Sequence, residues 1–249
     1  MNVAIIGYGR MGHMIESLAT QKGINVISTI DKFSKEAKFT EINEESMKDV
    51  DVAIDFTYPD SAIENMKQIS SLGVNLVMGT TGWYDHMDEA KEIIQKAATG
   101  MIWSGNFSLG VNLFFKIIEN TSKIMNNADD YDIFVHEFHH NQKADSPSGT
   151  ALMIGERILK NISRKKKIVS EELKRKINPE EIHVSSTRSG NIPGTHMVGF
   201  DSIADTIEIK HTARTREGFA LGAIKAAEFI KGKKGFYNID DLMKEIISS

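Results

Sequence analysis

The sequence contains no cysteine, only four prolines and no run of about 18 uncharged apolar residues. Without cysteine there is no disulfide, thiol nucleophile or cysteine-based metal site, which is typical of a cytoplasmic protein. The missing apolar run argues against a membrane partner, and the strand-like start at Met1 argues against a signal peptide. A net charge of −4 argues against a nucleic-acid partner. We therefore expect a soluble cytoplasmic protein.

Short apolar runs alternate with helical patterns over the first hundred residues. The runs cover residues 1–6, 25–30, 51–56, 74–78 and 101–103, and helical patterns cover residues 10–21, 59–72 and 87–98. Apolar strands separated by helices predict a doubly wound parallel sheet. In such a sheet, ligands bind beyond the carboxyl ends of the strands.

The loop after the first run has the spacing of a dinucleotide fingerprint. It reads Gly7-Tyr8-Gly9-Arg10-Met11-Gly12, and Asp31 follows at the end of the second run. The first glycine of such a loop makes a tight turn, the second lets the pyrophosphate approach, and the third allows helix and strand to pack. An acid about 20 residues further on binds the adenosine ribose. We expect these residues to bind NADH or NADPH.

Polar stretches follow the later runs at residues 55–57, 79–82 and 104–108. Such stretches suit backbone contacts to a cofactor, although each is also compatible with a plain turn between strand and helix. The expected cofactor contacts in the second and third stretches are Gly79, Thr80, Thr81, Ser104, Gly105, Asn106 and Phe107.

The segment 137–151 reads E-F-H-H-N-Q-K-A-D-S-P-S-G-T-A and lies between a strand-like run at residues 131–135 and a helical pattern at 148–159. Amide groups at a helix start attract anions. Lys143 adds a positive charge, and His139 and His140 add imidazoles that titrate near neutral pH. Taken singly, these residues would suit ordinary capping or a surface histidine. Their clustering favours a site for an anionic substrate that needs a proton.

This string resembles the signature of the 4-hydroxy-tetrahydrodipicolinate reductase family, also called dihydrodipicolinate reductase, of lysine and diaminopimelate biosynthesis. Matching stretches are D-F-T from Asp55, G-T-T-G from Gly79 and N-F-S-x-G from Asn106. The usual family loop, G-x-x-G-R-M-G, is one residue longer than the loop here. The resemblance implies NAD(P)H-dependent reduction of a cyclic imine with two carboxylates and loss of water. Residues 79–81 and 104–107 would contact the nicotinamide half.

The resemblance also implies roles for the mid-chain residues. His139 would give or take the proton, and Lys143 would supply charge and a second possible acid. The carboxylates of the substrate would be bound by His140, Lys143, Ser148, Gly149 and Thr150. We interpret Glu137 and Asp145 as orienting groups. Arg188 and Arg216 either line the cleft or face solvent.

Two further expectations concern the cofactor and metals. The carboxylate of Asp31 favours NADH because it would repel a 2′-phosphate, but Lys32 and Lys35 could offset that repulsion. We therefore lean to NADH and expect both cofactors to be used. We expect no metal, since the adjacent histidines His139 and His140 cannot share a helix face as the zinc motif H-E-x-x-H does.

The remaining pattern completes an α/β fold: an N-terminal Rossmann dinucleotide-binding domain plus an inserted α+β substrate and oligomerisation domain with a mixed sheet. A helix at 110–125 leads out, strands are expected at 182–188, 196–202 and 206–211, and residues 160–181 are expected to form a short helix and loops. Helices at 218–231 and 239–247, without a strand of their own, would return to the first domain. We place the dinucleotide domain at 1–107 and 213–249, and the second domain, which in the family builds a homotetramer, at 108–212.

Two rival interpretations remain at this stage. One is another two-domain nicotinamide dehydrogenase, for which the loop H-H-x-x-K followed by P-S-G-T would have no evident use. The other is a non-catalytic dinucleotide sensor, which would keep the glycine loop and Asp31 but would not need titratable groups such as His139.

Overall fold

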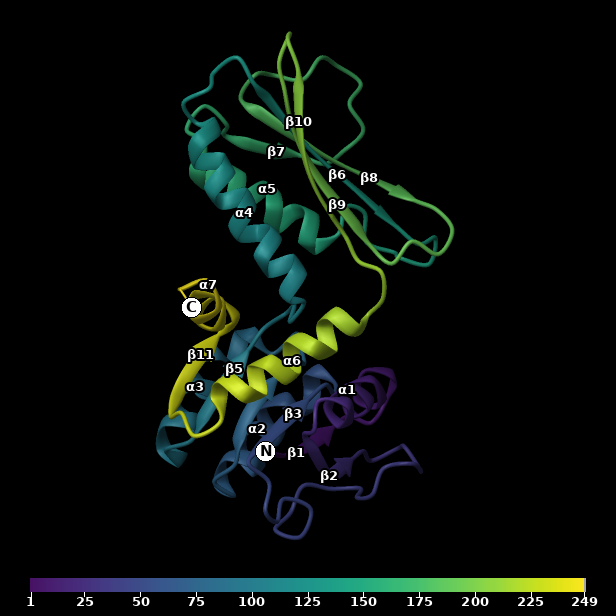
Figure 1. The fold of residues 1–249 in the computed structure, drawn as a ribbon, viewed down its shortest axis with the longest axis vertical. Helices are drawn as coiled ribbons and strands as arrows, with labels where there is room; N and C mark the ends of the chain where they lie inside the picture. The colour runs from purple at the N-terminus through teal and green to yellow at the C-terminus, as the bar shows by residue number, and fades with distance from the viewer. Residues whose placement is uncertain (249) are drawn as a thin grey trace. The chain divides into compact units, whose positions relative to one another are not determined.

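The computed structural model describes residues 1–248 and divides into two compact units. The first unit comprises Met1–Leu109 and the C-terminal segment from Glu217, and the second comprises Gly110–Arg216 (Figure 1). The chain thus leaves the first unit once and returns once, as an inserted domain requires. The breaks lie two and four residues beyond the expected ones (109 against 107, 216 against 212).

The first unit is built on a parallel sheet of six strands in the order β11-β5-β4-β3-β1-β2. Its order reverses between β1 and β3, so the loops after these two strands flank the switch point where such sheets bind ligands. The strands are β1 (Asn2–Ile6), β2 (Asn25–Ile30), β3 (Val52–Asp55), β4 (Asn75–Met78), β5 (Gly100–Trp103) and β11 (Gly235–Asn238).

Helices cover both faces of this sheet because its buried strands are apolar on both sides. In β1, Val3 and Ile5 face one core and Ala4 and Ile6 face the other. The first core contains residues of α1 (Arg10–Gln21), α6 (Glu217–Ile230) and α7 (Ile239–Ser248); the second contains residues of α2 (Pro59–Ser71) and α3 (Met87–Ala97), which follows the short 3₁₀ helix η1 (Tyr84–His86). The predicted doubly wound sheet is confirmed.

The expectation that the C-terminal segment has no strand of its own is wrong. Strand β11 pairs in parallel with β5, with Gly235 opposite Gly100 and Asn238 opposite Trp103. The segment has only four residues, all half-buried, and follows a basic run. So short a run carries neither the alternation nor the apolar length from which a strand is predicted.

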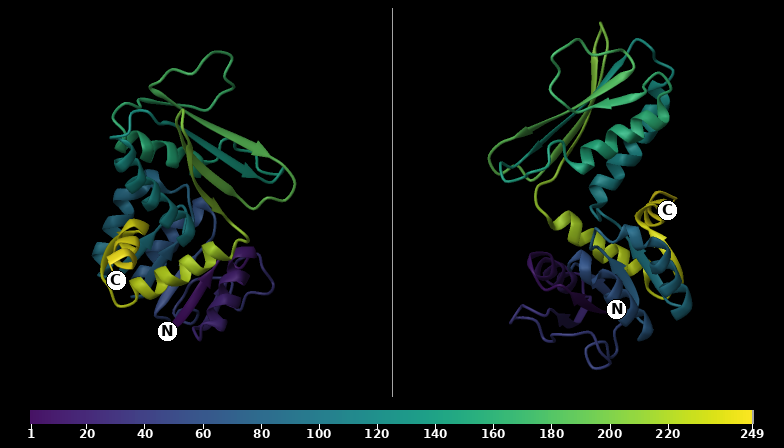
Figure 2. Two further views of the ribbon diagram at one scale, coloured as in Figure 1. Left: turned by 45° about the horizontal axis from the view of Figure 1, so that its top comes forward. Right: turned by 180° about the vertical axis from the view of Figure 1, so that it is seen from behind.

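The second unit has a five-stranded mixed sheet in the order β10-β9-β6-β8-β7. Strand β6 is parallel to β8 and antiparallel to β9. Helices α4 and α5 lie on one face of the sheet (Figure 2) and share one apolar core with it. The elements are α4 (Leu109–Met125), β6 (Asp132–His139), α5 (Gly149–Asn161), β7 (Lys167–Val169), β8 (Glu181–Arg188), β9 (Thr195–Asp201) and β10 (Thr206–Thr212).

Two local expectations in this unit need correction. Residues 160–181 contain strand β7 and the end of α5 but no further helix, since β7 completes the sheet edge beside β8. The strand expected at 131–135 continues to His139, because β6 keeps its neighbours β8 and β9 through its polar end. Among the described helices, none combines the length and apolarity that crossing a bilayer requires.

Candidate active site

The glycine loop after β1 has the backbone geometry that the fingerprint demands. Gly7 has φ +87°, and a Cβ there would lie 2.2 Å from the carbonyl oxygen of Phe56. A Cβ on Gly12 would lie 2.5 Å from the carbonyl oxygen of Gly7. A side chain at either position would disrupt the loop. Nothing lies within 4 Å of a Cβ built on Gly9, and this open space fits the close approach of a pyrophosphate.

Asp31 is held by the backbone on both of its carboxylate oxygens. Oδ2 accepts from the amide of Tyr8 at 2.8 Å, and Oδ1 accepts from the amides of Phe33 and Ser34 at 2.8 and 2.9 Å. Burial raises the pKa of Asp31, but these three bonds outweigh it and leave the pKa below its ordinary value. A carboxylate has about four acceptor positions, so about one remains for a ribose hydroxyl.

A buried hydrogen-bond network joins the loops after β3 and β4. Asp55 is fully buried, and its Oδ1 accepts from the Thr57 and Thr80 hydroxyls at 2.8 and 2.7 Å and from the Thr57 amide at 3.0 Å. Its Oδ2 accepts from Asn65 at 2.8 Å. Burial raises the pKa of Asp55, against the effect of these bonds. The network holds the expected cofactor loop at Gly79 in place through Thr80.

The other expected cofactor contacts divide into exposed and buried positions. Arg10, Lys32, Thr81 and Gly105 are exposed at this edge of the sheet, and Met11 and Asn106 are half-exposed. Ser104 is buried and its hydroxyl donates to the carbonyl of Asn106 at 2.9 Å, while the ring of Phe107 belongs to the core. The side chains of Ser104, Phe107 and Thr80 are therefore engaged within the protein, so that any cofactor contact at these residues falls to their backbone.

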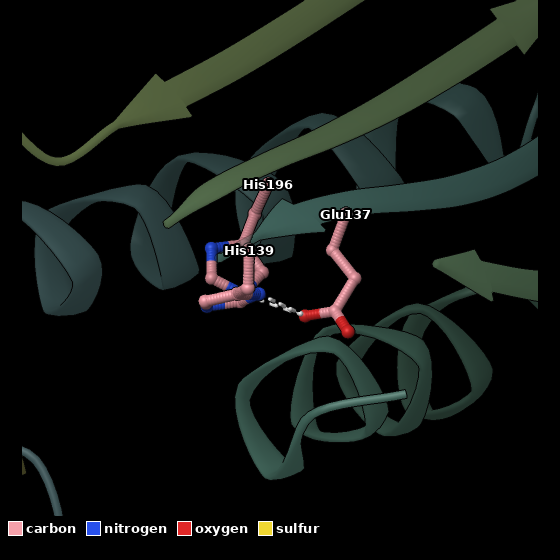
Figure 3. Close-up of side chains that lie close together, drawn as sticks. All are labelled: Glu137, His139 and His196. Atoms are coloured by element: carbon pink, nitrogen blue, oxygen red, sulfur yellow. Dashed lines mark ion pairs between the residues drawn. The ribbon is translucent and has the colours of Figure 1, made fainter. Parts of the chain in front are cut away.

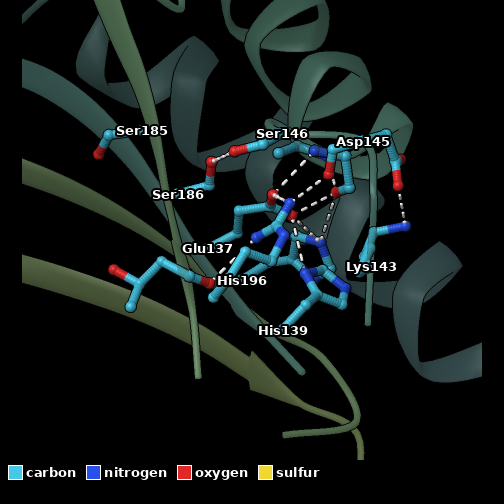
Figure 4. Close-up of polar contacts among 12 residues, drawn as sticks. Glu137, His139, Lys143, Asp145, Ser146, Ser185, Ser186 and His196 are labelled. Carbon is cyan, nitrogen blue, oxygen red and sulfur yellow. Dashed lines mark hydrogen bonds and ion pairs between the residues drawn. The ribbon is translucent and has the colours of Figure 1, made fainter. Parts of the chain in front are cut away.

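In the second unit, β6 changes character along its buried face. Ile133 and Val135 belong to the apolar core, but the next two residues on the same face are Glu137 and His139. The N-terminus of α5 lies against this polar end, where Ser148 is the N-cap and its Oγ accepts from the amide of Ala151. The strand pattern thus places a carboxylate and an imidazole beside a helix start (Figure 4).

Glu137 lies at the centre of this cluster and is fully buried. Its Oε1 accepts from the amide of Ser148 and from Arg188, both at 2.8 Å, and its Oε2 accepts from the hydroxyl of Ser148. His139 Nδ1 and His196 Nε2 lie 3.1 and 3.4 Å from Oε2 (Figure 3). Burial raises the pKa of Glu137, but the partners His196, Ser148 and Arg188 bring it well below its usual range.

His139 is neutral at neutral pH in this environment. Burial lowers its pKa to about 4, helped by the charges of Lys143 and Arg188 and by His196, although Glu137 opposes the shift. Its Nδ1 faces Glu137, but not at the angle of a hydrogen bond. A Cβ at Gly194 would lie 3.0 Å from its Nε2, so the glycine leaves that nitrogen clear of a side chain.

An internal carboxylate occupies the basic part of the loop. Asp145 lies 2.8 Å from the ammonium of Lys143, and hydrogen bonds from Lys143 and then from the backbone, including Gly149, lower its pKa. Thr150 and His140 are half-exposed nearby in sequence, and Gly149 is exposed. Both donors of Ser148 are directed to Glu137. Arg188 also donates to the carbonyl of Asp145, whereas Arg216 is exposed.

Sequence reasoning missed His196 and left Arg188 undecided. His196 is buried beside His139, with the two rings 5.2 Å apart. Arg188 and His196 lie on either side of the turn-rich stretch 189–194. That stretch indicates that β8 and β9 meet at the same end of the sheet, but it does not indicate that β6 lies between them. Among the described residues, Glu137, His139 and His196 have atoms close enough to hold a metal ion. Since the oxygens of Glu137 already accept hydrogen bonds from Arg188 and Ser148, we interpret the cluster as a buried carboxylate with two histidines beside it.

Comparison with known proteins covers the whole chain. The family model described as dihydrodipicolinate reductase, N-terminus, matches residues 1–107, and that described as dihydrodipicolinate reductase, C-terminus, matches residues 110–243. The chain is 38% identical over 251 residues to 4-hydroxy-tetrahydrodipicolinate reductase of Christiangramia forsetii, covering 100% of both. It is 37% identical to the enzyme of that name from Archaeoglobus fulgidus, over 98% of this chain and 100% of the relative.

A solved structure has the same fold. It is the dipicolinate-bound dihydrodipicolinate reductase from Paenisporosarcina sp. TG-14, which aligns with a TM-score of 0.77 at 21% identity over 96% of this chain and 97% of that one. The expected combination of a Rossmann sheet and a second mixed sheet is thereby confirmed.

Proposed function

The chain belongs to the dihydrodipicolinate reductase family, and we propose from that membership and from the site geometry which residues carry its reaction. The reaction is the reduction of 4-hydroxy-tetrahydrodipicolinate by a reduced nicotinamide dinucleotide, in lysine and diaminopimelate biosynthesis. Family membership over both halves decides against the rival dehydrogenase and sensor interpretations. When bound, the cofactor supplies the hydride; the ring of the substrate also takes up one proton and loses its hydroxyl as water.

The substrate is a small dicarboxylate, in keeping with the dipicolinate named for the related structure. We assign its carboxylates to Lys143, to the start of α5 at Gly149 and Thr150, and to His140. The observation that supports this assignment is the carboxylate of Asp145, which lies 2.8 Å from the ammonium of Lys143 and whose pKa is lowered first by Lys143 and more weakly by the backbone at Gly149. A substrate carboxylate fits the same two partners, and Asp145 then gives up its place. The sequence also predicts Ser148 for this set, but both of its donors are directed to Glu137.

His139 and Lys143 are the proposed catalytic residues. His139 is neutral before substrate binds, since burial lowers its pKa to about 4. A bound dianion favours the charged imidazole and raises that pKa again. His139 then holds the proton that the ring needs, and Lys143 stabilises the negative charge that develops on the ring.

Steady-state kinetics with the freshly made condensation product of pyruvate and aspartate semialdehyde tests these roles. We expect His139→Gln and Lys143→Ala each to lower kcat by about 10²–10⁴-fold, since general acid–base groups contribute on that scale. NADH binding should stay unchanged. Matched controls are His136→Gln, on the opposite face of β6, and Lys160→Ala, at the exposed end of α5. Wild-type kcat in both site variants would remove the assignment.

For the cofactor we propose binding at Gly7–Gly12 and Asp31, with Lys32 beside the ribose and with the backbone at 79–81 and 104–107 beside the nicotinamide. The acceptor position left on Asp31 suits one ribose hydroxyl, which supports preference for NADH with NADPH also accepted.

We also propose a cytoplasmic homotetramer built through the second unit. The location follows from the supply of reduced nicotinamide cofactor. The assembly is supported by exposed apolar side chains in this unit, which would be buried between subunits: Leu113, Ile117, Ile124, Ile203 and Ile207. Light scattering of the purified protein measures the subunit number, and a monomer would contradict the proposal.

A further inference from the structure

The carboxylate of Glu137 is fully buried and contacts side chains from four separate elements. Its partners come from the end of β8 (Arg188), the start of α5 (Ser148), the start of β9 (His196) and its own strand (His139). Each partner is directed to one of only two oxygens. The relative placement of these groups therefore depends on a single side chain.

The other buried glutamate of this unit shows what a purely structural carboxylate looks like. Glu181, at the far end of β8, is 5% exposed and pairs with both guanidinium nitrogens of Arg175 at 2.8 Å. It also accepts from the amide of Asn178, and its pKa is lowered to about 2, first of all by Arg175. Among the described residues, no histidine pairs with its carboxylate, and none of the residues proposed for the reaction contacts it. The two glutamates share burial and an arginine but differ in what else they hold.

The contacts of Glu137 determine how two proposed site residues present themselves. By taking both donors of Ser148, Glu137 holds the first turn of α5 so that the next amides, at Gly149 and Thr150, lead the helix start. By facing Nδ1 of His139 at 3.1 Å, it turns the other ring nitrogen toward the space beside Gly194. The negative charge of Glu137 favours a proton on the nearer nitrogen, Nδ1, which leaves Nε2 to exchange its proton.

We propose that Glu137 is a positioning residue for the reduction: it orients His139 for proton exchange at Nε2 and anchors the start of α5 that binds the substrate carboxylate. The inference rests on the proposed roles of His139 and of the helix start. Glu137 itself touches neither substrate nor cofactor in this scheme. Ser148 then acts through Glu137 instead of binding the substrate with its hydroxyl.

The pH dependence of the reaction separates positioning from mere stability. The groups that face His139 are Glu137 on the same strand, Arg188 from β8, His196 from β9 and Lys143 from the loop. Of these groups, only Glu137 raises the pKa of His139. In Glu137→Gln that negative charge is gone, so the protonated imidazole of His139 forms only at lower pH.

The test compares Glu137→Gln with Glu181→Gln, an identical change at a buried, arginine-paired glutamate of the same sheet. We expect Glu137→Gln to lower kcat by about 10²-fold, the lower end of an acid–base contribution, and to shift the imidazole limb of the kcat/KM profile to lower pH. NADH affinity should not change. Glu137→Asp, which keeps the charge, should restore the limb to its wild-type position. Glu181→Gln should alter only the free energy of unfolding.

Two results would overturn the proposal. One is a Glu137→Gln enzyme whose kcat and pH profile equal those of Glu181→Gln. The other, if Glu137→Gln does not fold, is a Glu137→Asp enzyme that is folded but has a displaced pH profile. Failure of the underlying site assignment looks different, because His139→Gln would then itself keep wild-type kcat.

Discussion

Two carboxylates, Asp55 in the first unit and Glu137 in the second, are both fully buried, yet their pKa values move in opposite directions. Asp55 is surrounded by neutral donors only, from Thr57, Thr80 and Asn65, and burial raises its pKa. The carboxylate of Glu137 has no exposed surface either, but it is less densely surrounded than that of Asp55 and it faces His196, Ser148 and Arg188, and its pKa falls. The depth of burial and the partners of a buried carboxylate thus decide its charge together.

The difference matches what each unit is proposed to bind. The loops around Asp55 present backbone groups and hydroxyls, which suit the uncharged nicotinamide end of a cofactor. The cluster around Glu137 pairs that carboxylate with the cation of Arg188, and Lys143 lies beyond it with Asp145 as partner. A dianionic substrate requires cations to pair with, and Lys143 would supply one once the substrate takes the place of Asp145.

Removing the cation beside Glu137 should give the largest loss of stability. Arg188→Met leaves a buried carboxylate without its charge partner, which costs about 3–5 kcal/mol in the free energy of unfolding at neutral pH. The folded pKa of Glu137 is lowered, so the stability it contributes is present above its unfolded pKa, about 4.3, and is lost as the pH falls through the folded value. The deficit of Arg188→Met should therefore shrink in acid.

Urea unfolding at neutral pH and at a pH of about 4.3, the unfolded pKa of glutamate, measures the loss of unfolding free energy in Arg188→Met under each condition. The double variant Arg188→Met with Glu137→Gln serves as the control, because it removes the uncompensated charge and should recover part of the stability. A deficit that grew as the pH fell would show that Arg188 does not act on Glu137 through its charge.

Asp55→Asn should have a smaller effect and the opposite pH dependence. The amide cannot accept from Asn65 as the second carboxylate oxygen does, and one unsatisfied buried donor costs about 1–3 kcal/mol. Because the folded pKa of Asp55 is raised, its contribution is full below the unfolded pKa, about 3.9, and is lost as the pH rises through the folded value. The deficit should thus be larger in acid than at neutral pH.

Urea unfolding over the same pH range checks this variant, with Asp60→Asn, at the exposed first turn of α2, as the control. If the loss of unfolding free energy changed with pH in the same direction in Asp55→Asn and Arg188→Met, the contrast between the two carboxylates would be contradicted. NADH affinity should also fall in Asp55→Asn, because the hydroxyl of Thr80 then donates to a neutral amide oxygen, a weaker acceptor than the carboxylate.

The sequence predicts those features of the fold and site that depend on neighbouring residues, and it misses those that depend on contacts between distant segments. The strand at 25–30 and the turn at Gly7 were predictable because apolar runs and glycine geometry are local signals. Strand β11 was not, since its pairing with β5 is set by the return of the chain from another unit. Likewise, Glu137 and Ser148 lie in one motif, but the meeting of His196 with them depends on the register between β6 and β9.

The smallest predicted effect concerns the choice between NADH and NADPH. We expect this choice to depend on the first unit and not on the substrate site of the second. Asp31→Asn removes the negative charge that we propose faces the ribose, while it keeps one oxygen for the amides of Phe33 and Ser34. The substitution also disturbs the hydrogen bond from the amide of Tyr8, which should weaken the binding of both cofactors equally. Only NADPH gains in addition, because its 2′-phosphate is no longer repelled by a carboxylate. The ratio of kcat/KM for NADPH to that for NADH should rise about tenfold, equivalent to about 1.4 kcal/mol. Equal losses for the two cofactors would show that Asp31 serves the loop and not the ribose, and Glu36→Gln, an exposed change nearby, should leave the ratio unaltered.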